Sequence, residues 1–318
     1  MDDETYPVEL TAPSIEPYRR GNTGIDYVTT FDSGVPGPHV MVNALTHGNE
    51  ICGAIAVDFL FREGVRPARG RLTLGFANVA AYRNFDPRVP TASRFVDEDF
   101  NRIWSESVLD SPRKSVELTR ARQLRPLIDT VDYLLDIHSM QHQTPPLGLS
   151  GPLKKGQTFA LDIGVPSIIV ADQGHAAGKR LRDYSFFGQE NDPRNAYLVE
   201  CGQHWEKASA DVAIDCTLRF LKSVATVAPS FLDRYLAKAP PPKTPRVIQV
   251  TEAVTVVSDD FHFAGPYRGM EEFEKKGTEI ARDGGKPVLT PYDGCVLIMP
   301  SRRLKKGLTA VRLGRYIA

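Results

Sequence analysis

The stretch Val40-Met41-Val42-Asn43-Ala44-Leu45-Thr46-His47-Gly48-Asn49-Glu50 decides how the rest of the chain is interpreted. Its apolar, β-prone part ends at His47, Gly48 permits a sharp turn, and the apolar segment from Ile51 to Phe61 has helical spacing. The pattern predicts a strand, a turn and a helix. In open α/β sheets, ligands and catalytic groups gather beyond the carboxyl ends of the strands, which is where this turn lies.

Two residues of this turn are of metal-ligand type. His47 and Glu50 stand three positions apart. A catalytic zinc site takes three protein ligands and leaves a fourth position to water, so the turn offers two of the three. Such a pair also arises by chance, and either residue could merely cap the turn. A third ligand from another strand is needed to favour a metal site.

The patterns along the chain predict an α/β domain with a largely parallel or mixed sheet. Ile25 to Phe31 alternates like an edge strand or a hairpin arm. A helix is expected from Ser111-Pro112, with the serine as N-cap, to about Asp129, and Lys207 to Lys238 looks mostly helical. Further strands are expected at Arg71–Ala77, Val131–His138, Pro166–Asp172 and Ala196–Glu200.

The clearest boundary is the proline run Pro240-Pro241-Pro242, which can continue neither a helix nor a sheet ladder. Beyond it, Val247 to Val257 alternates like a strand, and Gly and Pro recur to the end. We therefore expect a catalytic α/β domain over residues 1–239 and a small all-β domain over residues 243–318.

His138 supplies the missing ligand type at the end of its predicted strand. Asp136, two residues earlier on the same face, could orient a ligand imidazole or could pair with a nearby arginine. Glu200 ends the strand that begins at Ala196. A carboxylate there could move the proton in amide hydrolysis, with an ion pair as the alternative.

The loop before Ser105 is rich in arginine, aspartate and asparagine. A guanidinium binds a carboxylate through two parallel hydrogen bonds and an amide can add another, so Asn101 and Arg102 form a candidate substrate clamp. Arg94 could stabilise an oxyanion on the scissile carbonyl. Salt bridges from Arg94 to Asp97, Glu98 or Asp99 are the competing interpretation.

Composition favours a small-molecule partner. Lys plus Arg and Asp plus Glu number 39 each, so no global basic field favours nucleic acid. The acidic start and the lack of an apolar run near ~18 residues predict a cytoplasmic chain that does not span a membrane. The four cysteines are scattered and predict buried free thiols. A homo-oligomer is compatible with the sequence.

Four motifs in order resemble the succinylglutamate desuccinylase/aspartoacylase family, a deacylase branch of the zinc carboxypeptidase-like fold. They are His47-Gly48-Asn49-Glu50, Asp99-Phe100-Asn101-Arg102, Asp136-Ile137-His138-Ser139 and Val199-Glu200-Cys201-Gly202, and Pro291-Tyr292-Asp293-Gly294 looks like part of the family's small β-domain.

The resemblance implies one Zn²⁺ per chain held by His47, Glu50 and His138, with Glu200 transferring the proton. It implies that Asn101 and Arg102 contact a substrate carboxylate and that Arg94 contacts the substrate or transition state. The family also uses a further Arg and Tyr, for which Arg180, Arg182, Tyr184 and Arg194 compete. Among the other histidines, His142 could line the site and His204 is assigned to a loop.

The sequence thus predicts a zinc carboxypeptidase-like mixed sheet flanked by helices, with a small C-terminal all-β domain. The expected function is zinc-dependent hydrolysis of a linear amide, deacylating an N-acyl amino acid or related small metabolite. The alternatives are a metallocarboxypeptidase that acts on peptides and a non-catalytic binding protein on the same fold. The acyl group and the amine stay open.

Overall fold

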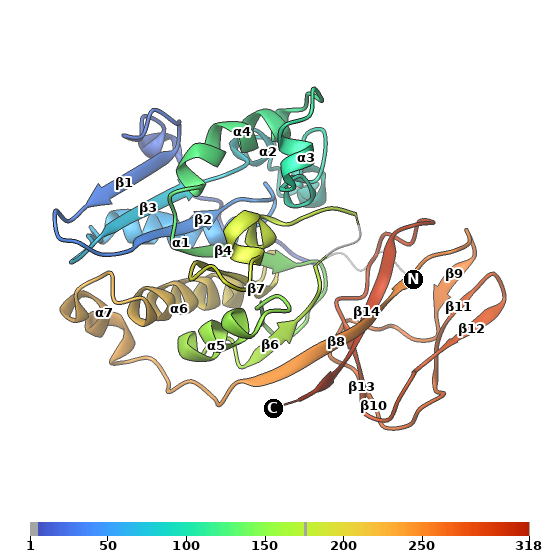
Figure 1. Ribbon diagram of the computed structural model, residues 1–318. Coiled ribbons are helices and arrows are strands. Elements are labelled where there is room, and N and C mark those ends of the chain that lie inside the picture. The colour runs from blue at the N-terminus through green and yellow to red at the C-terminus, as the bar shows by residue number, and fades with distance from the viewer. Residues whose placement is uncertain (1–5, 175–176, 318) are drawn as a thin grey trace.

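The computed structural model describes residues 6–174 and 177–317 as a mixed α/β fold built on one large sheet (Figure 1). That sheet has 11 strands. Their spatial order is β1 (Val28–Asp32), β3 (Arg71–Phe76), β2 (His39–Ala44), β4 (Tyr133–Met140), β7 (Asn195–Gln203), β5 (Leu147–Leu149), β6 (Ile168–Ala171), β8 (Arg246–Thr255), β14 (Thr309–Tyr316), β13 (Cys295–Ile298) and β10 (Glu272–Phe273).

Helices cover both faces of the first half of the sheet (Figure 1). The helices are α1 (Ile51–Arg62), α2 (Val79–Tyr82), α3 (Glu106–Leu109), α4 (Val116–Ile128), α5 (Lys154–Ile163), α6 (Lys207–Ser223) and α7 (Pro229–Leu236). The apolar residues of α1, α5 and α6 pack in one core, and those of α4 pack in a second core on the other face. Strands β2, β3, β4 and β7 run parallel and are buried, as expected for a sheet covered on both faces.

The strand predictions are confirmed in position, including β1 as an edge strand. The helix start at Ser111 is wrong. Ser115 is the N-cap of α4 and accepts a hydrogen bond from the Leu118 amide at 2.9 Å. Residues 111–113 stay outside the helix because the Arg122 guanidinium binds the carbonyl oxygens of Ser111 and Arg113.

The mostly helical pattern expected over Lys207–Lys238 is confirmed, and it consists of two helices. Between them Ala225 takes a left-handed conformation with φ of 50°, and Pro229 begins α7 at its first turn. Strand β5 and helix α5 were not expected. The sequence of β5 is only three residues long and lies among prolines and glycines, which favour turns.

Every element from Arg246 to Tyr316 is a strand, as the sequence predicted. The three remaining strands form a separate sheet in the order β12 (Lys286–Leu289), β11 (Glu279–Asp283) and β9 (Phe261–Phe263). Strand β8 nevertheless pairs with β6, so the large sheet continues past the proline run. The division into domains at residues 239–243 therefore stays a prediction.

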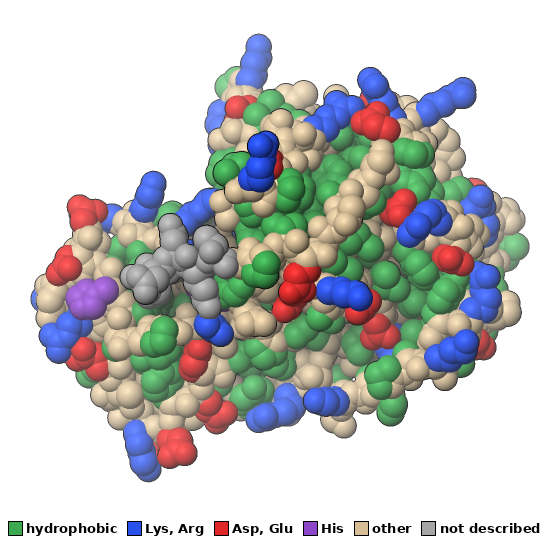
Figure 2. Space-filling view, turned by 180° about the vertical axis from the view of Figure 1, so that it is seen from behind, with side chains coloured by type: hydrophobic (Ala, Val, Ile, Leu, Met, Phe, Trp, Pro, Cys, Tyr) green, Lys and Arg blue, Asp and Glu red, His purple; other side chains and the backbone are tan. Residues whose placement is uncertain are grey.

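On the face shown in Figure 2, Lys and Arg side chains are interspersed with Asp and Glu side chains. This mixture fits the equal totals of the two signs. Within the described ranges, no helix has the length and apolar character needed to cross a bilayer. All four cysteines are buried and free, as expected.

Candidate active site

The turn after β2 is fixed by close backbone packing. Gly48 is required there, because a Cβ at this position would lie 2.4 Å from the backbone of Ala81 and Tyr82 and 2.5 Å from the Ser93 carbonyl oxygen. The Gly48 amide donates to the carbonyl oxygen of Arg94 at 3.1 Å. The turn is thereby joined to the arginine-bearing loop, and α1 begins directly after Glu50.

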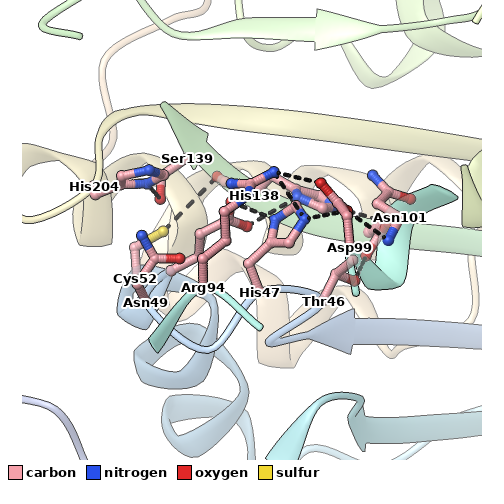
Figure 3. Close-up of polar contacts among 12 residues, drawn as sticks. Thr46, His47, Asn49, Cys52, Arg94, Asp99, Asn101, His138, Ser139 and His204 are labelled. Carbon is pink, nitrogen blue, oxygen red and sulfur yellow. Dashed lines mark hydrogen bonds and ion pairs between the residues drawn. The ribbon is translucent and has the colours of Figure 1, made fainter. Parts of the chain in front are cut away.

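The three predicted ligands converge. His47, Glu50 and His138 are buried, and one ligand atom from each lies within 4.8 Å of the others. Nδ1 of His47 lies 2.7 Å from Oε1 of Glu50, and Nδ1 of His138 lies 2.9 Å from Oε2. The second contact is an ion pair, and Oε2 of Glu50 has no hydrogen-bond partner in the described part of the chain. The ring centroids of the two histidines are 5.3 Å apart (Figure 3).

Each imidazole is oriented by a carboxylate on its other side. Nε2 of His47 lies 2.9 Å from Asp99, and Nε2 of His138 lies 2.8 Å from Asp136. Both Nδ1 atoms therefore face Glu50. The outer carboxylates fix the tautomer and ring orientation, which is the arrangement that metal-binding histidines use.

The charges around this cluster favour the binding of a positive charge within it. Burial alone would lower the pKa of His138, but Asp136 and Glu50 raise it well above its usual value. Burial would likewise raise the pKa of Glu50, but the two histidines hold it well below the usual value. Because a proton or a divalent cation can supply that charge, two imidazoles and one carboxylate of this kind fit a zinc ion.

Glu200 lies on β7 opposite His138 on β4 in parallel register. Burial raises the pKa of Glu200 to about 8, and the neighbouring His138 and Arg94 oppose that shift. Its Oε2 is buried and has no hydrogen-bond partner among the described residues. A carboxyl group with a pKa near neutrality suits proton transfer in both directions.

The position of Arg94 is compatible with both interpretations that the sequence left open. Its Nη2 lies 3.0 Å from Nε2 of His47 and 3.1 Å from Asp99, and its Nη1 lies 3.6 Å from Glu50. The salt bridge to Asp99 is thus present, and the same guanidinium lies beside the ligand cluster. Burial would raise the pKa of Asp99, but His47 and Arg94 hold it well below its usual value.

These side chains line one cavity of about 340 Å³. All seven predicted site residues are among its lining, namely His47, Glu50, Arg94, Asn101, Arg102, His138 and Glu200. The C-terminal strands and loops contribute Arg268, Arg303 and Arg312. A cavity of this size suits a small molecule.

The comparisons with known proteins agree with this geometry. Residues 36–183 match the model of the succinylglutamate desuccinylase/aspartoacylase catalytic domain. The family model, the curated relatives and the solved structures all indicate the succinylglutamate desuccinylase/aspartoacylase family. The family match includes six of the seven predicted site residues and ends before Glu200.

Two of the similar proteins resemble the chain over most of its length, and a third resembles it over about a third. A succinylglutamate desuccinylase of Pseudoalteromonas atlantica is 22% identical over 303 residues, covering 86% of this chain and 79% of the relative. A human N-acyl-aromatic-L-amino acid amidohydrolase (carboxylate-forming) is 32% identical over 117 residues, covering 33% and 34%. The structure of a Vibrio parahaemolyticus succinylglutamate desuccinylase has a TM-score of 0.67 at 19% identity, covering 92% of this chain and 87% of that one.

Of the four candidates for the further arginine and tyrosine of the family, one lines the cavity. Arg180 does so, but it is engaged by Asp172 and Asp183. Arg182 binds the carbonyl oxygens of Ser150 and Ala196, Tyr184 bonds to Asp129, and Arg194 pairs with Asp192. No tyrosine occurs among the described residues that line the cavity.

The family motifs did not reveal two lining residues. Arg312 lies on β14 with its Nε 3.6 Å from Asp172. His204 lies in a turn after β7, as assigned, but it is only 1% exposed and lines the cavity. Burial lowers the pKa of His204 to about 3. His142 also lines the cavity, as its position suggested.

Proposed function

We propose that the chain is a zinc-dependent hydrolase of a linear amide that removes the acyl group from an N-acyl amino acid or a related small metabolite. One observation carries the proposal: two Nδ1 atoms and a carboxylate converge in a cavity that the buried Glu200 also lines. The names of the relatives, a desuccinylase and an amidohydrolase, support the same class of reaction.

His47, Glu50 and His138 would hold the metal. When bound, a zinc ion would polarise the amide carbonyl and acidify water. The chain's own contribution begins with Asp99 and Asp136, which keep both Nδ1 atoms turned toward Glu50.

Glu200 would carry the proton. It would accept a proton from the water whose oxygen attacks the carbonyl carbon, and it would then deliver that proton to the nitrogen of the leaving amine. The C–N bond breaks, and the products are a carboxylate and a free amine. Its buried position and raised pKa suit this exchange.

Asn101 and Arg102 would bind the carboxylate of the amino acid. Oδ1 of Asn101 accepts a hydrogen bond from the Leu181 amide at 2.9 Å, so its NH₂ group is the part that can donate to a substrate. Burial lowers the pKa of Arg102 to about 10, which leaves it charged at neutral pH. Arg94 would donate to the oxyanion that develops on the scissile carbonyl.

The C-terminal residues in the cavity favour a small substrate over a peptide. Arg303 and Arg312, which follow the helix-flanked part of the sheet in the chain, line the cavity. They narrow the space that a peptide would need in a metallocarboxypeptidase. A non-catalytic binding protein would have no need of an unpaired carboxylate such as Glu200.

A panel of N-acyl amino acids and short peptides, incubated with the zinc-loaded protein, tests the proposal. We expect release of a free amino acid from at least one N-acyl amino acid and none from peptides. Glu200→Gln should retain zinc and lower turnover by ~10²–10⁴, whereas His138→Ala should lose the metal in elemental analysis. Stoichiometric zinc without hydrolysis of any panel member would support the binding protein instead.

A further inference from the structure

Part of the cavity lining is apolar and is built by a single hydrophobic cluster. Four of the lining residues belong to this cluster or pack against it, namely Met140, Leu149, Leu198 and Met299. The cluster also contains residues of the C-terminal strands β8 and β13, which extend the sheet beyond its helix-flanked part (Figure 1). Because the four side chains pack in one cluster, they face the cavity as one apolar surface, which we call the apolar wall.

Strand register places the apolar wall beside Glu200. Leu198 is two residues before Glu200 on β7, so the two side chains lie on the same face of the sheet, roughly 6–7 Å apart along the strand. Met140 follows His138 at the same spacing on β4. Leu149 on β5 is paired directly with Leu198 and extends the wall to the side of β7 that lies away from β4. The wall therefore adjoins the groups that are proposed to act on the scissile bond.

Met299 contributes to the wall from the C-terminal part of the chain. Its side chain is half-buried and packs against the cluster, and its backbone has a left-handed conformation with φ of 52°. The apolar surface that Met299 leaves exposed gains free energy only when another apolar group covers it. Methionine side chains are flexible and adapt to apolar groups of different shapes, which suits a binding surface.

We propose that the apolar wall binds an apolar group of the substrate, so that the substrate is an N-acyl amino acid with a large aliphatic or aromatic group. The inference rests on the proposed deacylase function and names its substrate class. The group is either the side chain of the amino acid or the chain of the acyl group, since both extend from the scissile amide. A polar group at the wall would lose its hydration without a hydrogen bond in return, because the four side chains offer no donor.

Two pairs of substrates, given to the zinc-loaded protein, separate the two sources of the apolar group. N-acetyl-leucine and N-acetyl-asparagine have side chains of similar shape and different polarity. N-hexanoyl-alanine and N-acetyl-alanine differ only in the length of the acyl chain. We expect kcat/KM to favour the more apolar member of at least one pair by about 10-fold or more, the value of burying a leucine-sized group.

Met299→Gln tests the wall without emptying the core, because glutamine has nearly the shape of methionine and Met299 is half-buried. The ratio of the two kcat/KM values in the preferred pair should fall about fourfold, the value of one buried methylene. Loss of folded protein would lower both values equally and leave the ratio unchanged. Met299→Leu should keep the preference, since leucine is also apolar.

Met270→Gln is the matched control. Met270 is also half-buried, has a φ of 71° and packs against the same cluster, but it is not among the described residues that line the cavity. We expect the ratio in Met270→Gln to equal that of the parent. An equal fall of the ratio in Met270→Gln and Met299→Gln would overturn the inference, because the effect would then come from the cluster and not from the cavity.

Failure of this inference is distinguishable from failure of the deacylase function. Hydrolysis with no preference for the apolar member of either pair would overturn the apolar wall and leave the deacylase in place. If no N-acyl amino acid is hydrolysed, the same four compounds are compared by calorimetric binding. Tighter binding of an apolar member, weakened in Met299→Gln, would support the wall without the reaction, whereas equal binding or none would overturn both.

Discussion

Asp136 shows how much of the site depends on residues that never touch a metal or substrate. It is fully buried, and its Oδ1 accepts from Asn43 and Thr46 at 2.8 Å each, while Oδ2 faces His138. Burial alone would raise its pKa, but His138 and these donors hold the pKa below its usual value. The carboxylate is therefore a fixed charge that turns the imidazole.

Asp136→Asn should weaken zinc binding by about 10–100-fold. The asparagine amide would no longer hold the proton of His138 on Nε2, which leaves Nδ1 free to bind the metal. Competition with a chelator of known affinity measures this. Asp162→Asn is the control, since Asp162 is exposed on α5. Wild-type zinc affinity in Asp136→Asn would show that the imidazole is held by other contacts.

His39 allows a prediction about acid stability that is separate from the active site. Its ring bonds to Thr73 at 2.7 Å and to Thr130 at 2.9 Å, and burial, aided by Arg71, lowers its pKa to about 4. Above pH 6.5 the imidazole is neutral in both the folded and the unfolded chain. Between pH 6.5 and about 4 only the unfolded chain takes up the proton, so the folded state loses up to about 3 kcal/mol over that window.

In His39→Gln, the free energy of unfolding measured in urea should therefore decline less steeply between pH 6.5 and 4 than it does in the parent. His262→Gln, at an exposed position, should keep the parental slope. Equal slopes for His39→Gln and the parent would mean that His39 titrates normally in the folded chain.

Single residues of the ligand cluster were predictable because each follows an apolar run that ends at the same sheet edge. His47 follows β2, and His138 and Glu200 lie in the carboxyl-terminal halves of the adjacent strands β4 and β7, whose apolar runs can be read from the sequence. His204 was not predictable in this way. Its ring orientation depends on the hydroxyl of Ser139, 65 positions earlier in the sequence, and on no local pattern.

At the scale of elements, α4 positions the loop that carries Arg94 and Asp99. Glu117, in the first turn of α4, is fully buried and accepts hydrogen bonds from the amides of Val96, Asp97 and Glu98 at 2.7, 3.0 and 3.3 Å. In return, the Asp97 carboxylate accepts from the amide of Val116 at 2.7 Å. The loop and the helix end therefore hold one another in register.

Glu117→Gln should lower the free energy of unfolding by about 3 kcal/mol. The glutamine NH₂ group cannot accept a hydrogen bond, so the backbone amides of the loop would lose their charged acceptor. Turnover should fall as well, since the displaced loop carries Arg94. Urea unfolding and steady-state kinetics measure both effects. Glu106→Gln, at an exposed position of α3, is the matched control, and a Glu117→Gln protein of parental stability would contradict this account.

The false helix start at Ser111 and the unexpected strand β5 share a cause. Ser111-Pro112 has the right residues for an N-cap, but Arg122, from the middle of α4, holds the carbonyl oxygen of Ser111 outside the helix. Strand β5 exists because β6 and β7 lie on its two sides, not because Leu147–Leu149 favours extended structure. Local propensity fails where long-range contacts supply the hydrogen bonds.

At the scale of the whole molecule, the C-terminal strands extend the sheet and complete the cavity. The sequence predicted their all-β character, but it gave no sign that Arg312 on β14 reaches the site. That position depends on the pairing of β8 with both β6 and β14, which joins segments far apart in the chain. Arg312 lies near Asp172, which already binds Arg180 at 2.7 and 3.0 Å.

Since Asp172 is already paired with Arg180, Arg312 has charge to offer an anionic substrate. We expect Arg312→Ala to raise KM for an N-acyl amino acid by about 10-fold or more, as lost charge-assisted hydrogen bonds are worth about 1.5–3 kcal/mol. The value of kcat should change less, because Glu200 and the ligand cluster stay in place. Arg315→Ala removes an exposed arginine of the same strand and should leave both constants unchanged. A KM for Arg312→Ala equal to that of Arg315→Ala would mean that the C-terminal strands shape the cavity without binding the substrate.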